Sequence, residues 1–268
     1  RMEDIISECK ELCDSGVREL IIVAQDITRY GIDLYGKRVL PELLNELCKI
    51  DGAKWIRLHY LYPDEITDEL IDTIANEDKI LKYLDIPIQH IDDKILKKMN
   101  RRGTGREIRE LLGKIKERIP GVVLRTSLIS GLPGEGEAEF EELCDFLREE
   151  KIPRAGVFPY SPEEGTPAAK MERPDEETAQ ERARLIMELQ DTIMDEYNNS
   201  RIGTTVEVLC EGYDLESGYY AGRSFAESPD IDGQIMFSGD DIPAGTFVKV
   251  KITDSIDGEL MGIAQQND

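Results

Sequence analysis

Short apolar runs alternate with segments of helical periodicity through the first three-quarters of the chain, and this alternation restricts the fold most. The run Leu20-Ile21-Ile22-Val23-Ala24 has the length and composition of a strand buried on both faces. Further strands are predicted at 55–58, 83–86, 122–129 and 155–158, and helices at 41–50, 67–77, 93–99, 105–119 and 138–150. Strands separated by helices form a parallel sheet through right-handed crossovers. We therefore predict an α/β fold, a partial and open TIM-like barrel with fewer strands than the eight of a complete one.

The pattern changes in the last quarter of the chain. A long helix is predicted at 176–199, after the proline-rich loop 159–174. Beyond Gly203, five short strands separated by glycine-containing turns are predicted at 205–210, 219–223, 234–237, 247–253 and 260–264. Five short strands in so few residues indicate a small antiparallel β-barrel. We expect two domains, at residues 1–200 and 201–268.

Charge and hydropathy exclude several classes of protein. The 56 acidic residues outnumber the 33 basic ones and give a net charge of −23, which repels a nucleic-acid backbone. Direct nucleic-acid binding is therefore not expected. A bilayer span needs about 20 consecutive apolar residues, and the sequence has no such run, so we predict a cytoplasmic protein without a membrane partner.

The five cysteines are scattered and odd in number, which favours reduced thiols over a disulfide framework. Cys9 and Cys13 have the spacing that opens a cluster-binding triplet, but the third position is Gly16. Both cysteines fall on the apolar face of the predicted first helix, so we interpret them as small buried residues. No zinc or iron–sulfur ligand set is expected from the residues of this chain.

Polar residues follow the predicted strands where those strands end. Gln25 and Asp26 follow the first strand, Gln89 and His90 the third, and Tyr160 the fifth. Parallel α/β folds build their sites at the carboxyl ends of strands, which favours a site. Asp26 could instead cap a turn, and a loop histidine such as His90 could equally be structural.

Two features of the fourth strand also suggest a ligand. Arg125 is a charge within an otherwise apolar run, and its partner could be a ligand carboxylate or a carboxylate of the protein. The turn Gly131-Leu132-Pro133-Gly134 directly precedes a helix, where glycine lets the backbone approach a ligand closely. Its spacing differs from that of a phosphate loop or a dinucleotide fingerprint.

Four motifs in order resemble those of the radical S-adenosylmethionine methylthiotransferases. They are VAQDITRYG at 23–31, LDIPIQH at 84–90, RTSLISGLPGE at 125–135 and YSPEEGTPA at 160–168. Within that family, Glu163-Glu164 and the segment 228–233 resemble the branch that methylthiolates the β-carbon of an aspartate in ribosomal protein S-twelve. They resemble the tRNA-modifying branch less. Leu132 and Gly136 depart from the phenylalanine and threonine that the family usually has.

The resemblance implies a fold, cofactors and residue roles. It implies a radical S-adenosylmethionine barrel followed by an OB-like TRAM domain, with S-adenosylmethionine and two 4Fe–4S clusters in the full-length enzyme. Gln25 and Asp26 would lie near the methionyl amino group and Arg125 near its carboxylate. The turn residues Gly131, Pro133 and Gly134 would pack on the adenosine, and Gln89, His90 and Tyr160 would border the substrate pocket.

The same resemblance places the cluster cysteines upstream of Arg1. The chain is then expected to be a fragment without catalytic residues or metal ligands of its own, unable to bind the clusters and inactive alone. Residues 201–268 hold thirteen carboxylates and four basic side chains, a net charge of −9. Such a domain is expected to attract a basic ribosomal protein by long-range steering, unless its acidity serves solubility alone. A tRNA methylthiotransferase and a non-catalytic binding module are the competing interpretations.

Overall fold

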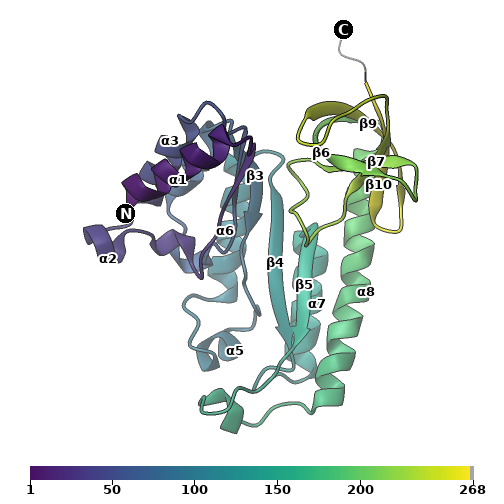
Figure 1. Cartoon of the computed structure of the whole chain (residues 1–268). Helices are drawn as coiled ribbons and strands as arrows, with labels where there is room; N and C mark the ends of the chain where they lie inside the picture. The colour runs from purple at the N-terminus through teal and green to yellow at the C-terminus, as the bar shows by residue number, and fades with distance from the viewer. Residues whose placement is uncertain (266–268) are drawn as a thin grey trace. The chain divides into compact units, whose positions relative to one another are not determined.

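The computed structural model describes residues 1–265 and divides into two compact units, residues 1–190 and the residues from 191 onwards (Figure 1). The division falls inside the long helix α8, Glu176–Arg201. The boundary proposed from the sequence, between residues 200 and 201, lies at the end of the same helix.

The first unit is built on a five-stranded parallel sheet in the order β1-β2-β3-β4-β5. Its strands are β1 Glu19–Ile22, β2 Trp55–Leu58, β3 Ile80–Asp85, β4 Val123–Ser130 and β5 Arg154–Pro159. The strands lie within a few residues of the predicted positions. Both faces of β2 and β3 are buried, whereas β1, β4 and β5 are partly exposed. The predicted open sheet of five parallel strands is confirmed.

Helices connect these strands, and Figure 1 shows α6 and α7 on the same face of β3, β4 and β5. Side-chain caps explain several starts: Thr67 accepts from the N–H of Leu70, and Thr104 forms a capping box with Glu107. None of the described helices is long and apolar enough to cross a membrane. The helices of this unit are α1 Met2–Asp14, α2 Ile32–Tyr35, α3 Leu40–Cys48, α4 Asp68–Asn76, α5 Asp93–Lys98, α6 Gly105–Arg118, α7 Glu137–Glu150 and the first part of α8.

A fully buried arginine lies in the strand next to the β1 edge of the sheet. Arg57, in β2, is 0% exposed, and its Nε donates to Glu19 Oε1 at 2.7 Å from the adjacent strand. Its guanidinium also lies 4.7 Å from the centre of the Tyr83 ring. A buried charge needs such partners. The sequence pattern shows an apolar strand at this position and does not identify them.

The second unit contains a closed barrel in the order β10-β8-β7-β6-β9. Its strands are β6 Thr205–Asp214, β7 Tyr219–Arg223, β8 Ile235–Ser238, β9 Phe247–Ile256 and β10 Glu259–Ala264. Buried apolar side chains of β6, β8, β9 and β10 fill the interior, including Val208, Ile235, Phe237, Val250 and Leu260. The five predicted strands are confirmed.

One strand pair corrects the prediction of a purely antiparallel barrel. β10 pairs with β8 in parallel, and the other four pairs are antiparallel. The reason is topological, because a closed ring of five strands cannot reverse direction at every neighbour. At least one pair must run parallel, and the barrel is therefore mixed.

Candidate functional site

Gln25 and Asp26 follow β1 and lie at the wall of a cavity of about 530 Å³. The Asp26 carboxylate accepts the backbone N–H of Thr28 at 3.0 Å and also its hydroxyl, so it caps the short 3-10 turn Ile27–Arg29. Asp26 is half-buried and Gln25 is exposed. Asp26 therefore caps a turn, which was the alternative to a ligand site, and both residues also lie at the wall of the cavity.

Arg125 has a carboxylate partner within the protein. Its Nη1 donates to Asp85 Oδ1 at 2.9 Å across the β3–β4 pairing, where the two residues lie opposite each other. The side chains are 12% and 2% exposed, and Asp85 Oδ2 also accepts the N–H of Tyr60 at 3.4 Å. This is the ion pair that the sequence left open. It fixes the guanidinium within the sheet, and the role toward a ligand carboxylate stays a prediction.

Gln89 is held against β4 by backbone hydrogen bonds. The Gln89 N–H donates to Ser127 O at 2.9 Å, and its carbonyl accepts from Ile129 N–H at 2.8 Å. Gln89 has φ = +67°, a left-handed conformation that costs a non-glycine residue about 1–2 kcal/mol. Non-glycine residues in this conformation are held there by their surroundings, and they concentrate at functional sites.

His90 is fully buried and faces a carboxylate. Its Nδ1 accepts the backbone N–H of Asp92 at 3.0 Å, so the ring proton is on Nε2. Nε2 lies 3.4 Å from Glu135 Oε2, which is long for a good hydrogen bond. The structure thus brings His90 to the turn after β4, and its predicted place at a substrate pocket stays a prediction.

Glu135 connects that turn to α8. Its Oε1 accepts the N–H of Gly131 at 2.9 Å and Nη1 of Arg182, also at 2.9 Å. Burial alone would raise the pKa of Glu135, but the His90 imidazole, the Gly131 N–H and the Arg182 guanidinium together hold it below its ordinary value. The carboxylate is therefore ionised at neutral pH and surrounded by donors.

Both glycines of this turn have a left-handed conformation, and Gly131 is also required by packing against α8. Gly131 has φ = +76°, and a Cβ there would lie 2.3 Å from the Cβ of Ala179 in α8. Gly134 has φ = +87°, and a Cβ would lie 2.1 Å from Lys98 Nζ. Pro133 is buried between them. The predicted packing of this turn on adenosine is not tested by these contacts.

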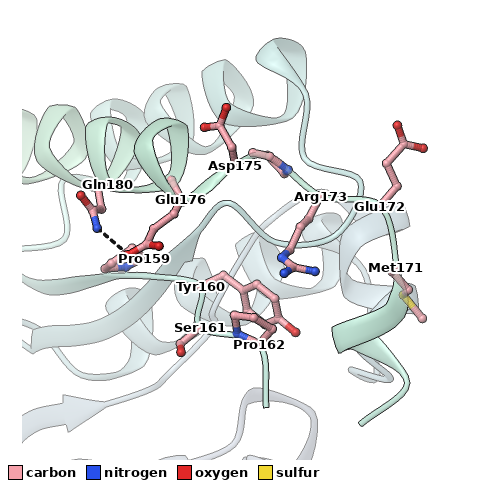
Figure 2. Close-up of a pocket in the computed structure, with 12 residues that line it drawn as sticks. Pro159, Tyr160, Ser161, Pro162, Met171, Glu172, Arg173, Asp175, Glu176 and Gln180 are labelled. Atoms are coloured by element: carbon pink, nitrogen blue, oxygen red, sulfur yellow. Dashed lines mark hydrogen bonds between the residues drawn. The ribbon is translucent and has the colours of Figure 1, made fainter. Parts of the chain in front are cut away.

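Tyr160 follows β5 and lines a second cavity, of about 570 Å³, beside the start of α8. Its backbone N–H donates to Ser130 O at 2.8 Å, which ties the strand ends of β4 and β5 together. In Figure 2 the Arg173 side chain points toward Tyr160. Within the described residues this cavity shares no lining residue with that of Gln25 and Asp26. The predicted site residues therefore line at least two separate surfaces.

Among the described residues, no group of three or more cysteine, histidine or carboxylate side chains is arranged to hold a metal ion. Cys9 and Cys13 are buried along α1, where burial raises the pKa of both thiols. The cavity of Gln25 and Asp26 is different. Its volume is typical of small-molecule sites, and an amide and a carboxylate on its wall fit a ligand that carries an amino group.

Sequence reasoning missed Arg182 and the central position of Glu135. Arg182 is 9% exposed and shares the buried side of α8 with Ala179, Ala183, Ile186 and Gln190. This spacing of three, four and seven residues marks one helix face. A periodicity analysis that included polar residues could have found it.

Comparisons with known proteins agree with both units. Residues 1–147 match the model of the radical SAM superfamily, and residues 202–264 match that of the TRAM domain. The chain is 48% identical over 265 residues to the ribosomal protein uS12 methylthiotransferase RimO of Clostridium botulinum strain Hall. That alignment covers 98% of this chain and 59% of the relative.

Two further proteins are similar. The protein of the same name from Caldanaerobacter subterraneus is 49% identical over 264 residues, covering 98% of this chain and 60% of the relative. Coproporphyrinogen III oxidase from Escherichia coli, a solved structure, is 18% identical with a TM-score of 0.48 over 70% of this chain and 46% of that chain. The chain thus spans about three-fifths of the length of the curated relatives it matches. Because the first family model covers more than half of its residues, the chain belongs to the radical SAM superfamily, and it carries a TRAM domain.

Proposed function

We propose that this chain is part of a methylthiotransferase that adds a methylthio group to the β-carbon of an aspartate in ribosomal protein uS12. The observation that carries the proposal is the 48–49% identity across 98% of the chain, through both units, to proteins of that name. The motifs at 23–31, 84–90, 125–135 and 160–168 support it further.

In this proposal, the residues of this chain bind and orient the cofactor and the acceptor. When bound with its iron–sulfur cluster, S-adenosylmethionine supplies the radical chemistry. Gln25 and Asp26 hold the amino group of the methionyl moiety. Asp85 holds Arg125 in place to bind the methionyl carboxylate. Gly131, Pro133 and Gly134 contact the adenosine, and Gln89, His90 and Tyr160 border the acceptor.

The complete enzyme needs more than this chain. The ligands of its two 4Fe–4S clusters would come from residues outside positions 1–268, so the chain alone would be inactive. Residues 1–200 would form the catalytic domain and residues 201–268 the TRAM domain of a cytoplasmic enzyme. The net charge of −9 in the latter attracts a basic partner and disfavours nucleic acid.

The full-length enzyme with reconstituted clusters tests the function. We expect uS12 to gain one methylthio group by mass spectrometry, and uS12 with asparagine at the acceptor position to gain none. Association of uS12 should weaken as salt rises, since screening removes the steering. Modification of tRNA instead of uS12 would contradict the proposal and support the tRNA-modifying alternative. Cluster-loaded enzyme that modifies neither would favour a binding module.

Replacing Arg125 with alanine is expected to weaken S-adenosylmethionine binding by about ten- to a hundredfold, the range for losing a charge-assisted hydrogen bond. Isothermal titration of the full-length enzyme measures the effect. Asp85→Asn is the matched control, because it breaks the same ion pair and keeps the guanidinium. Unchanged affinity in Arg125→Ala would reject a direct contact between Arg125 and the cofactor.

A further inference from the structure

Three arginines gather at the cavity of about 530 Å³ beyond β1, in a chain whose net charge is −23. They are Arg29, from the turn that Asp26 caps, and Arg101 and Arg102, from the segment after α5. The cavity therefore combines side chains from three segments that lie far apart in the sequence, 24–29, 62–65 and 100–102. The wall also carries three carboxylates, those of Asp26, Asp64 and Glu65, so it is less acidic than the chain as a whole.

Of the three carboxylates on this wall, Glu65 is paired, Asp26 caps a turn through one oxygen, and Asp64 is exposed. Glu65 pairs with Arg38 and lies 3.6 Å from Arg102, and Asp26 accepts both donors of Thr28. Within the described part of the chain, Arg29 and Arg101 have no carboxylate at ion-pair distance, which leaves two cations for a ligand. These two guanidinium groups can bind an anion, beside the amide and carboxylate that fit an amino group.

Arg101 is the best organised of the three. Its guanidinium stacks over the Tyr62 ring, 4.8 Å from the ring centre, and the side chain is half-buried. Its backbone N–H donates to Leu96 O at 2.8 Å, and the preceding Asn100 has φ = +55° and donates to Lys97 O. Both contacts fasten the segment to the end of α5. The loop therefore holds Arg101 in place before any ligand arrives.

Stacking also determines which groups remain available. A guanidinium that lies flat on an aromatic ring uses its face there, and its N–H donors stay in the plane of the group. Two parallel N–H donors match the two oxygens of a carboxylate. The cavity wall also contains Gln25 and Asp26, the proposed contacts of the cofactor. A carboxylate on Arg101 would thus lie beside the cofactor site.

We propose that Arg101, stacked on Tyr62 and assisted by Arg29, binds the side-chain carboxylate of the acceptor aspartate. This inference rests on the proposed function and adds the residues that recognise the substrate. A nucleic-acid phosphate is the other anion that arginines bind, but the strong net negative charge of the chain disfavours a polyanionic partner.

The test is a double-mutant cycle on the full-length, cluster-loaded enzyme. The protein change is Arg101→Gln, and the partner change replaces the acceptor aspartate of uS12 with asparagine. Each change alone is expected to raise the Kd for uS12 by about tenfold. The two changes together are expected to raise it by little more than either change alone, because they remove the same interaction. Arg101→Lys should be intermediate, since an ammonium lacks the paired donors.

Arg106→Gln is the matched control. The Arg106 side chain, in α6, is 82% exposed and does not line the cavity, so this substitution should leave the Kd unchanged.

Additive effects in the cycle would overturn the proposal. So would a loss of S-adenosylmethionine affinity in Arg101→Gln, or weaker tRNA binding without an effect on uS12. If the wild-type enzyme modifies uS12 and the cycle shows no coupling, only this inference fails. If the wild-type enzyme does not modify uS12, the proposed function fails and this inference with it.

Discussion

Replacing Glu135 with glutamine is expected to lower the free energy of unfolding by about 3–5 kcal/mol at neutral pH, the usual effect of removing one partner of a buried ion pair. The Glu135 side chain is 0% exposed and that of Arg182 is 11% exposed. The substitution keeps the shape of the side chain and removes the charge that compensates this arginine. Glu137, 3.2 Å away at the surface, is then the remaining carboxylate partner of Arg182.

The hydrogen-bond geometry makes the effect larger than the loss of charge alone. Donors face both oxygens of Glu135, with Gly131 N–H and Arg182 on one and His90 Nε2–H on the other. A glutamine amide has an acceptor on one side and a donor on the other. Either orientation therefore places its N–H₂ group against another donor in a buried site.

The effect should also depend on pH. Because the pKa of Glu135 is lower in the folded protein than its ordinary value of 4.5, ionised Glu135 stabilises the fold above that value. This contribution disappears as the pH falls through the folded-state pKa. Denaturant unfolding followed by circular dichroism should therefore show a large difference between wild type and variant at neutral pH and a smaller one in acid.

Glu142→Gln is the control for this experiment, since Glu142 is an exposed residue of α7, the helix that begins two residues after Glu135. It is expected to change stability by less than about 0.5 kcal/mol. A Glu135→Gln variant as stable as this control would show that the Glu135–Arg182–His90 cluster contributes nothing to the fold.

Replacing Gly131 with alanine is the second change with a large expected effect, about 3 kcal/mol of lost stability. A left-handed conformation costs a non-glycine residue about 1–2 kcal/mol, and overpacking adds about 1–3 kcal/mol. The added Cβ would lie 2.3 Å from that of Ala179, so α8 must shift away from the end of β4.

Gly121→Ala separates these two contributions. Gly121 has φ = +77°, almost the same as Gly131, but a Cβ there has no heavy atom within 4 Å. Denaturant unfolding should show a loss of about 1–2 kcal/mol for Gly121→Ala and a clearly greater loss for Gly131→Ala. Adding Ala179→Gly to Gly131→Ala should recover part of the difference. Equal losses at both glycines would mean that the contact with α8 is unimportant.

The sequence predicted the positions of the helices and strands well, and the pairing of strands and side chains poorly. The limits of β2 and β7 agree with the predicted ranges, and Thr67 and Thr104 begin their helices as caps. The four-residue helix Ile32–Tyr35 was not predicted, because it is shorter than the repeat that reveals a helix. The parallel β8–β10 pair was also missed, since strand direction in a closed barrel depends on how the ring closes.

The candidate site shows the same contrast. Its residues were predicted at strand ends, and the structure places Gln25, Asp26 and Tyr160 at cavities. It places His90 and Arg125 in contact with carboxylates that the sequence could not assign. Arg101 was not among the predicted residues, because its importance arises from stacking on a tyrosine of another loop.

The amino-acid sequence by itself determined which segments become strands and helices, and that polar residues gather at one edge of the sheet. That information is local, because the burial of a segment is written in the spacing of its own apolar residues. Only the tertiary structure decided which charges meet. Arg125 and Asp85 are separated by 40 residues and Arg182 and Glu135 by 47, and no spacing within either segment specifies the other. Those pairings depend on how the crossovers bring distant strand ends and the start of α8 together.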